Sequence, residues 1–249
     1  MRQSSRMRIA FLPTAMISFL MMGCGGSDRE IESTARYELP MEHRIVVETV
    51  VDLPFDQAWD DLIRRLSESS FRVSTLEKAS RFVAVELLRS SDLAASANRP
   101  ARYVDCGRTV RTFSDGDTPE QFDYDVAKSS HHREASVVEG GYRVSEVDRR
   151  VELAARTALY LQPEGQRRTR ITLKTSYEVK IQVSGNARFV PVDSGEADGP
   201  RETFGPRAES IRFTTFQPGQ DQRRGGLTCR ATGDLEHALI ALANPAAAI

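Results

Sequence analysis

The side chains best able to do chemistry are the thiols of three cysteines, Cys24, Cys106 and Cys229. A thiol can be acylated, can be oxidised to a disulfide, or can bind a metal ion as its thiolate. A zinc site needs ligands at short, regular spacings, and the four histidines of the chain are scattered. A metal site that joins Cys106 and Cys229 with His237 is therefore the weaker interpretation.

Two further groups of polar side chains are concentrated between positions 114 and 141. The adjacent His131 and His132 have no carboxylate in register with them, and we assign them no role. Five acids in this segment have the oxygen ligands that calcium prefers, but the glycine and terminal glutamate of a calcium-binding loop are not at the required spacing. We interpret these acids as a solvated run and expect no metal or cofactor; they are Asp115, Asp117, Glu120, Asp123 and Asp125.

Cys24 follows a segment with the features of an export signal. Three arginines precede an apolar run, Ile9–Met22, which ends at a small residue before the cysteine. The run is about 14 residues long, shorter than the roughly 20 that a transmembrane helix needs. Positively charged flanks and a short apolar centre are typical of a secretory signal, so a signal peptide over residues 1–23 is predicted.

The end of this signal, Leu20-Met21-Met22-Gly23-Cys24, resembles the lipobox of bacterial lipoproteins. The resemblance implies cleavage after Gly23, diacylglyceryl transfer to the Cys24 sulfur and acylation of the new amino group. Several acyl chains hold a protein firmly to a membrane, whereas a single chain does so marginally. Gly25 stands where an aspartate would imply retention in the inner membrane, so an anchor on the periplasmic face of the outer membrane is expected. The alternative is a plain secretory signal in which Cys24 has no role.

If Cys24 carries lipid, Cys106 and Cys229 remain as an even pair in an oxidising compartment. A disulfide between them spans 123 positions. In the chain-entropy model, a loop of this size destabilises the unfolded state by about 4.7 kcal/mol or slightly more. The alternative is two free, buried thiols, and we expect the disulfide.

The charge of the mature chain is slightly acidic. The full sequence has 34 basic and 35 acidic residues, so removal of the three signal-peptide arginines leaves 31 basic residues and a net charge of about −4. An exported chain with this balance has no basic surface field for nucleic acid. We therefore expect no nucleic-acid partner.

A single α+β domain is expected from residue 43 to residue 244. Alternating apolar residues predict a strand over 44–51, and apolar spacings of three and four predict an amphipathic helix from Pro54 to a break at Ser67–Ser70. Two further strands are predicted over 71–75 and 81–88. This order predicts an antiparallel sheet with the helix packed on one face.

The second half of the domain has the clearest strand pattern. Apolar residues alternate over 151–161 and 171–183 on either side of a turn, which predicts a long β-hairpin. A shorter strand is predicted over 211–215. A short C-terminal helix is predicted from Thr232 to a stop at Asn244.

Three segments are predicted to lack regular structure. Residues 24–42 are polar and rich in small residues, as a flexible tether from a membrane should be. Residues 114–141 and 184–209 have no apolar period, and we interpret them as loose inserts in the domain.

The segment Leu53–Trp59, followed by Leu62, Leu66 and Phe71–Val73, resembles the helix-grip domain of the C subunit lipoproteins of the outer-membrane β-barrel assembly machinery. Those lipoproteins have two such domains, whereas one is expected here. The pieces Tyr103–Gly107 and Cys229–Gly233 resemble segments of uncharacterised exported lipoproteins. The resemblance implies a helix-grip-like fold and a role in binding or assembly at the cell envelope.

The sequence contains no recognisable catalytic motif, such as a phosphate-binding glycine loop, a nucleophile elbow or a zinc-protease helix. We therefore predict a non-catalytic binding or assembly component with envelope proteins as partners. The alternative is a carrier that holds a lipid or another small hydrophobic ligand between the sheet and the helix that contains Trp59.

Overall fold

The computed structural model describes residues 30–89, 103–116, 118–193, 195–221 and 226–248. Antiparallel strands dominate it, with two α-helices, α1 (Phe55–Glu68) and α2 (Asp234–Ala243), and a short 3-10 helix, η2 (Pro245–Ala248). The structure therefore confirms the expected α+β class. The strands are β1 (Glu32–Glu38), β2 (Glu48–Val51), β3 (Arg72–Glu77), β4 (Phe82–Arg89), β5 (Val104–Asp105), β6 (Arg108–Ser114), β7 (Glu120–Asp125), β8 (Ser130–Val138), β9 (Gly141–Glu164), β10 (Arg168–Pro191), β11 (Glu202–Thr214), β12 (Gly219–Gln220) and β13 (Thr228–Ala231).

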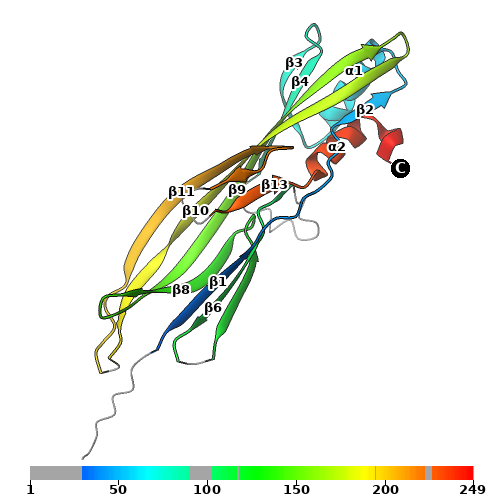
Figure 1. The fold of residues 1–249 in the computed structure, drawn as a ribbon. Helices are drawn as coiled ribbons and strands as arrows, with labels where there is room; N and C mark the ends of the chain where they lie inside the picture. The colour runs from blue at the N-terminus through cyan, green and yellow to red at the C-terminus, as the bar shows by residue number, and fades with distance from the viewer. Residues whose placement is uncertain (1–29, 90–102, 117, 194, 222–225, 249) are drawn as a thin grey trace, which may run out of the picture.

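The hairpin of β9 and β10 runs the whole length of the molecule (Figure 1). Each strand has 24 residues, paired without a break from Gly141 opposite Pro191 to Glu164 opposite Arg168. The predicted alternation is confirmed, because every second side chain over 151–161 and 171–183 is buried. Both strands extend beyond those ranges because neighbouring strands continue to pair with them.

The hairpin connects two differently built ends. At its turn, β4 pairs with β9 and β2 pairs with β10, and both α-helices pack nearby; we call this the helical end. At the other end, β8 pairs with β9 from Gly141 to Arg149, and β11 pairs with β10. There a second sheet, in the order β1-β6-β7, lies over the first, and we call this the sandwich end.

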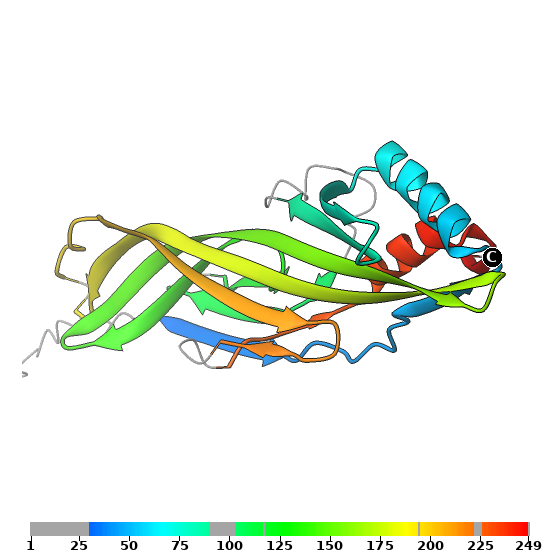
Figure 2. The same ribbon diagram turned by 90° about the horizontal axis from the view of Figure 1, so that it is seen from above.

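The helical end has an apolar core beneath α1. The helix follows Pro54, has Asp56 in its first turn, and buries four side chains that the spacing predicted, Ala58, Trp59, Leu62 and Leu66. Strand residues such as Leu159 and Ile171 belong to the same buried cluster. In Figure 2 the two helices lie close together at this end, and the Arg65 guanidinium donates a 3.1 Å hydrogen bond to the Leu242 carbonyl of α2.

The core of the sandwich end is smaller. Its buried cluster consists of Ile31, directly before β1, together with Phe113 of β6, Val144 of β9 and Val190 of β10. These residues join the two sheets face to face. Phe122, Ala135 and Tyr142 pack against them, and the buried polar side chain of His132 lies beside Tyr124 at the same end.

The two cysteines expected to pair lie at disulfide-bonding distance between these ends. Cys106 and Cys229 form a buried disulfide, with their Cα atoms 4.0 Å apart. Beside it, the Tyr37 hydroxyl donates to the Cys106 carbonyl at 3.0 Å and accepts from the Thr228 backbone N–H at 3.0 Å. Tyr37 thus connects β1 to both sides of the disulfide.

The prediction of a flexible tether over residues 24–42 is wrong for Glu32–Glu38. These residues form β1, which pairs along its whole length with β6. Most side chains of β1 are exposed, so it has no apolar period to identify it. The strand exists because β6 supplies backbone hydrogen-bond partners, and the folded part of the chain begins before residue 43.

The prediction of loose inserts over 114–141 and 184–209 is also wrong for most of those residues. The first contains β7 and β8, and the second contains the end of β10 and the start of β11. Their faces are largely polar, and backbone pairing with side-chain ion pairs across strands takes the place of apolar alternation.

Candidate functional site

A hollow with a volume of about 640 Å³ lies across β4, β9, β10 and β11. We call it the outer-face hollow, because the core-facing side chains of these strands are the odd-numbered ones, such as Leu153 and Val179, and the even-numbered ones point to the opposite face. The even-numbered side chains at the hollow belong to Glu86, Ala154, Arg156, Ser176, Glu178, Arg212 and Thr214.

Strand register determines how these side chains are arranged. Ser176 lies opposite Arg156 on one neighbouring strand and opposite Thr214 on the other, and Glu178 lies opposite Ala154 and Arg212. Paired residues of antiparallel strands project to the same face, so they form adjacent rows. Small side chains therefore lie along the middle of the hollow, with charged side chains beside them.

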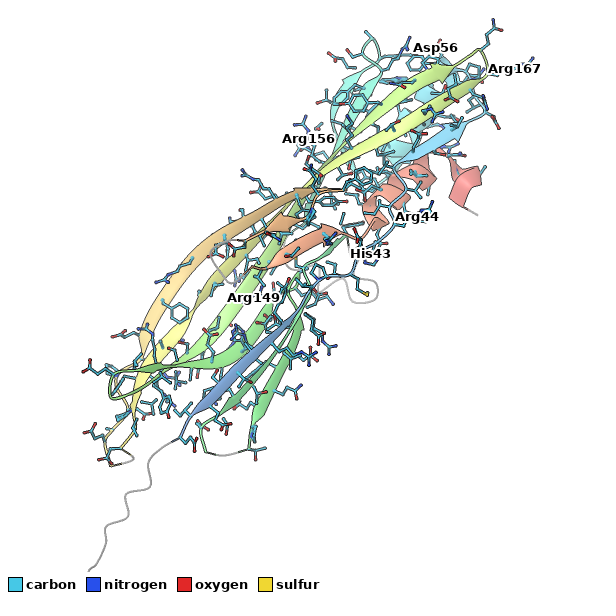
Figure 3. The ribbon with its side chains drawn as sticks, viewed as in Figure 1. His43, Arg44, Asp56, Arg149, Arg156 and Arg167 are labelled. Carbon is cyan, nitrogen blue, oxygen red and sulfur yellow. A yellow bond between two sulfur atoms is a disulfide. The ribbon has the colours of Figure 1, made fainter. Side chains whose placement is uncertain are left out.

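The charged side chains at the hollow differ in whether they form hydrogen bonds. Glu178 accepts two hydrogen bonds from the Arg212 guanidinium, at 3.2 Å from Nε and 3.0 Å from Nη2. Arg156 projects from the middle of the long hairpin (Figure 3) and lies opposite Glu86 of β4 in the register. Within the described part of the chain, its guanidinium has no hydrogen bond or ion pair. Arg156 is thus available to bind an anionic group in a planar, bidentate way.

This arrangement suits binding. Its lining includes the Arg156 guanidinium and, opposite it, the Glu86 carboxylate, neither of which has a hydrogen bond or ion pair among the described residues. The hydroxyls of Ser176 and Thr214 and the carboxylates of Glu86 and Glu178 are among the groups that line it. A partner with a narrow apolar portion and a carboxylate or phosphate fits these side chains.

A buried carboxylate lies beneath one side of the hollow. Glu236 of α2 is fully buried, and its Oε1 accepts hydrogen bonds from the Tyr177 hydroxyl at 2.8 Å and the Thr215 hydroxyl at 2.7 Å. Burial, together with the negative charge of Glu236, raises the pKa of Tyr177 well above its usual value. Tyr177 therefore stays neutral as a donor. Its ring stacks on Phe213 with centroids 5.1 Å apart, so the cluster joins α2 to the strands that form the hollow.

A second polar cluster lies between the sheets of the sandwich end. His132 is 2% exposed, and its ring stacks on Tyr124 with centroids 5.5 Å apart. Its Nε2 is 3.5 Å from the Glu134 carboxylate, which also accepts a 2.7 Å hydrogen bond from Arg111. Burial lowers the pKa of His132 below its usual value, against the opposite effect of the Glu134 hydrogen bond. The Arg149 guanidinium lies 5.1 Å from the Tyr124 ring centroid.

The structure places the predicted site residues in different surroundings. Cys24, the predicted lipidation site, lies outside the described residues. Cys106 and Cys229 are joined in the core, and neither residue is at the hollow. The two histidines point in different directions. The expectation that no carboxylate is in register with them is wrong for His131, which pairs with Asp148 between β8 and β9 and lies 2.9 Å from its carboxylate, whereas His132 points into the sandwich.

The acidic run is engaged by neighbouring groups. Glu120 and Asp115 both bind Arg133, at 2.8 Å and 3.3 Å, and Asp123 forms an ion pair with Arg108. Asp125 accepts a 2.9 Å hydrogen bond from the Ala127 backbone N–H. Asp117 lies outside the described residues. Among those that are described, no three histidine, cysteine or acidic side chains come together as metal ligands do.

Sequence reasoning missed the buried roles of Glu236 and His132. The prediction of a C-terminal helix gave Glu236 no buried role. It precedes Leu239 and Ile240 by three and four positions, and this spacing places it beside the apolar stripe of α2. His132 has no comparable signal, because the strand that directs it inward has no apolar period.

The fold defines a class, an α+β protein dominated by antiparallel sheet and containing a hollow suited to binding. No family model, curated protein or solved structure matches the chain. No helix in the described ranges is both long enough and apolar enough to cross a membrane.

Proposed function

We propose that this protein is a lipoprotein anchored through acylated Cys24 to the periplasmic face of the outer membrane, where it serves as a non-catalytic binding or assembly component of the cell envelope. The pairing of Cys106 with Cys229 carries the proposal. It leaves Cys24 as the one cysteine without a partner thiol, and a buried disulfide agrees with an oxidising compartment. The lipobox resemblance of Leu20–Cys24 provides the chemistry of attachment.

The binding surface of the proposed function is the outer-face hollow. Three features of the hollow suit a segment of another envelope protein that has an acidic or carboxylate group: the guanidinium of Arg156, which has no hydrogen bond or ion pair within the described ranges, the small side chains of Ala154 and Ser176, and an open position on the sheet. A helix-grip arrangement, in which α1 packs across the sheet, is part of this proposal. In it the helix supports the sheet from the core face and leaves the other face to the partner.

The attachment is tested by mass spectrometry of the N-terminal peptide from membranes. We expect a peptide that begins at Cys24 and has the added mass of the acyl groups. In a Cys24→Ser variant the protein should leave the membrane on a high-salt wash. A mature chain with an unmodified Cys24 thiol contradicts the proposal.

The binding role is tested by photo-crosslinking in intact cells. A photoreactive residue at Ser176, in the hollow, should yield adducts with a defined envelope protein. The matched control is the same residue at Gln166, which is exposed in the hairpin turn far from the hollow. Equal adducts from the two positions, or none from Ser176, contradict the proposed binding surface.

A carrier function is the second candidate, and the size of the hollow favours it. A volume of about 640 Å³ lies within the range of small-molecule sites. The space between α1 and the sheet, where the carrier prediction placed the ligand, holds packed side chains such as Trp59, Leu62 and Leu159. Native mass spectrometry of the protein without its anchor distinguishes the two functions, because a carrier retains a stoichiometric hydrophobic adduct.

A further inference from the structure

Four exposed apolar side chains gather at the far edge of the sandwich end. Val137 is 83% exposed, and Val138, Phe189 and Val192 are 37–39% exposed. Single exposed apolar residues are ordinary on protein surfaces, but several of them at one edge make that edge a candidate interaction site. We call these four residues the apolar rim.

The apolar rim surrounds one turn of the main sheet. Val137 and Val138 are the last residues of β8, directly before the turn that contains Gly140. The Val192 backbone N–H donates a 3.2 Å hydrogen bond to the Gly140 carbonyl, and the Phe189 ring lies beside the same glycine. Successive residues of a strand point to opposite faces, so Val137 and Val138 project from both sides of the sheet edge.

The polypeptide enters the fold at this same end. Ile31, directly before β1, packs with Phe113, Val144 and Val190 in the core of the sandwich end. Figure 1 shows the start of β1 at the end of the molecule opposite α1, α2 and the C-terminus. The rim and the start of the described chain are thus neighbours.

Chain length limits how far this end can lie from a lipid anchor. Seven residue spacings separate Cys24 from Ile31, and a fully extended chain covers at most about 25 Å over that number. The 24 residues of β9 extend about 80 Å at the usual rise of a strand. An acylated Cys24 therefore holds the sandwich end close to the bilayer, whereas it sets no such limit on the helical end.

The charges around the apolar rim are mixed. Glu139 and Arg143 are exposed next to it, and Arg188 forms a 3.4 Å ion pair with Asp198. A surface without an excess of basic residues gains little from anionic lipid headgroups. Contact with a bilayer at this edge is consequently driven by the apolar side chains, and it needs no anionic lipid.

From these observations we infer that the apolar rim enters the interfacial layer of the phospholipid bilayer to which the protein is anchored. The inference rests on the proposed acylation of Cys24, which supplies the proximity. It predicts the orientation of the molecule on the membrane, with the sandwich end at the bilayer and the helical end farthest from it. Because the anchor keeps the rim near the bilayer, even weak insertion of a few side chains is populated.

The test uses acylated protein reconstituted in phosphatidylcholine vesicles whose acyl chains are brominated, since bromine quenches tryptophan at membrane depth. Val137→Trp and, as a second position, Val192→Trp place a reporter on the rim. Arg167→Trp is the matched control, at the opposite end of the hairpin (Figure 3). Native Trp59 is buried in α1 and contributes the same background to all variants.

We expect blue-shifted emission from the rim tryptophans and loss of most of that added emission in brominated vesicles, with the Arg167→Trp emission unchanged. If Cys24 is acylated and the protein is bound to vesicles, but neither rim reporter is quenched, the inference is overturned and the proposed function stands. The same unquenched result is expected if the partner of the rim in cells is a protein and not the lipid, and it overturns the inference in that case too. If Cys24 is not acylated, the inference and the proposed function fail together.

Discussion

The two ends of the long hairpin are stabilised by different interactions. The helical end buries large apolar side chains of α1 and α2 against the sheet, in a cluster that continues to the disulfide. The sandwich end has a four-residue apolar core with Phe122, Ala135 and Tyr142 packed against it, and it also buries the polar side chains of His132 and Arg149. Apolar packing is insensitive to pH, whereas a buried polar network depends on its protonation state. The apolar core beneath α1 is thus expected to be insensitive to pH, whereas the polar interior of the sandwich end is expected to be sensitive to it.

The disulfide lies between the two ends, and its removal has the largest expected effect. Cys106→Ala with Cys229→Ala opens a loop of 123 positions and should lower the free energy of unfolding by about 4 to 5 kcal/mol in the chain-entropy model. Urea unfolding of the double variant measures this loss. Cys24→Ser is the matched control and should unfold as the wild type does. A loss below about 1 kcal/mol contradicts the stabilising role of the bridge.

Leu62→Ala should weaken the helical end. The Leu62 side chain is 1% exposed in the core beneath α1, and truncation of a buried leucine leaves a cavity that costs about 3 kcal/mol. Urea unfolding measures the change, and Leu76→Ala, at an exposed position of β3, is the control. The loss should be equal at pH 5 and pH 7. A pH-dependent loss would remove the contrast between the two ends.

His132 should make the sandwich end sensitive to acid. Because burial lowers its pKa in the folded state, the unfolded state binds a proton more readily, so stability is fully present above the unfolded pKa of about 6.5 and falls as the pH drops below it. Urea unfolding at pH 7 and pH 5 should show a loss in the wild type. The loss should be smaller in His132→Gln, whatever the absolute stability of that variant.

The adjacent histidine provides the control for this pH dependence. His131 is exposed beside Asp148, so His131→Gln should keep the wild-type loss between pH 7 and pH 5. Hydrogen exchange should place the acid-labile amides in β7 and β8, leaving α1 protected. Exchange that rises first in α1 would show that the helical end is the acid-sensitive one.

Arg156→Ala has the smallest expected effect on stability and separates binding from folding. Its guanidinium is exposed, so the free energy of unfolding should change by no more than about 0.5 kcal/mol. The crosslinks from Ser176 should nevertheless decrease, because the unengaged charge at the hollow is lost. Arg167→Ala, in the exposed hairpin turn, is the matched control for loss of one surface arginine. Undiminished crosslinking in Arg156→Ala would exclude this arginine from the binding surface.

Prediction from the sequence succeeded where apolar side chains follow a regular period. The central hairpin over 151–161 and 171–183 and the amphipathic helix after Pro54 were predicted because one face of each is buried in the structure. Prediction failed for Glu32–Glu38 and for much of 114–141 and 184–209. Those strands have polar residues on both faces, and their partners are distant in the sequence, so no local pattern identifies them.

The candidate site was less predictable than the fold. Nothing in the sequence relates Arg156 to Ser176 or Thr214, because strand register alone brings them to one face. The position of Glu236 beside Leu239 and Ile240 was the one available signal for its burial. The pairing of Cys106 with Cys229 was predictable only because it follows from counting thiols once Cys24 is assigned to lipid.

The sequence by itself determined the apolar faces of the main hairpin and helices, the short apolar segment that ends at Cys24, and the cysteine count, because each of these is a local pattern or a sum. The tertiary structure decided which polar segments became strands, which histidine was buried, and which side chains met at the outer-face hollow and the apolar rim. Backbone hydrogen bonding between strands is indifferent to side-chain polarity, so these outcomes depended on partners that only the folded chain brings together.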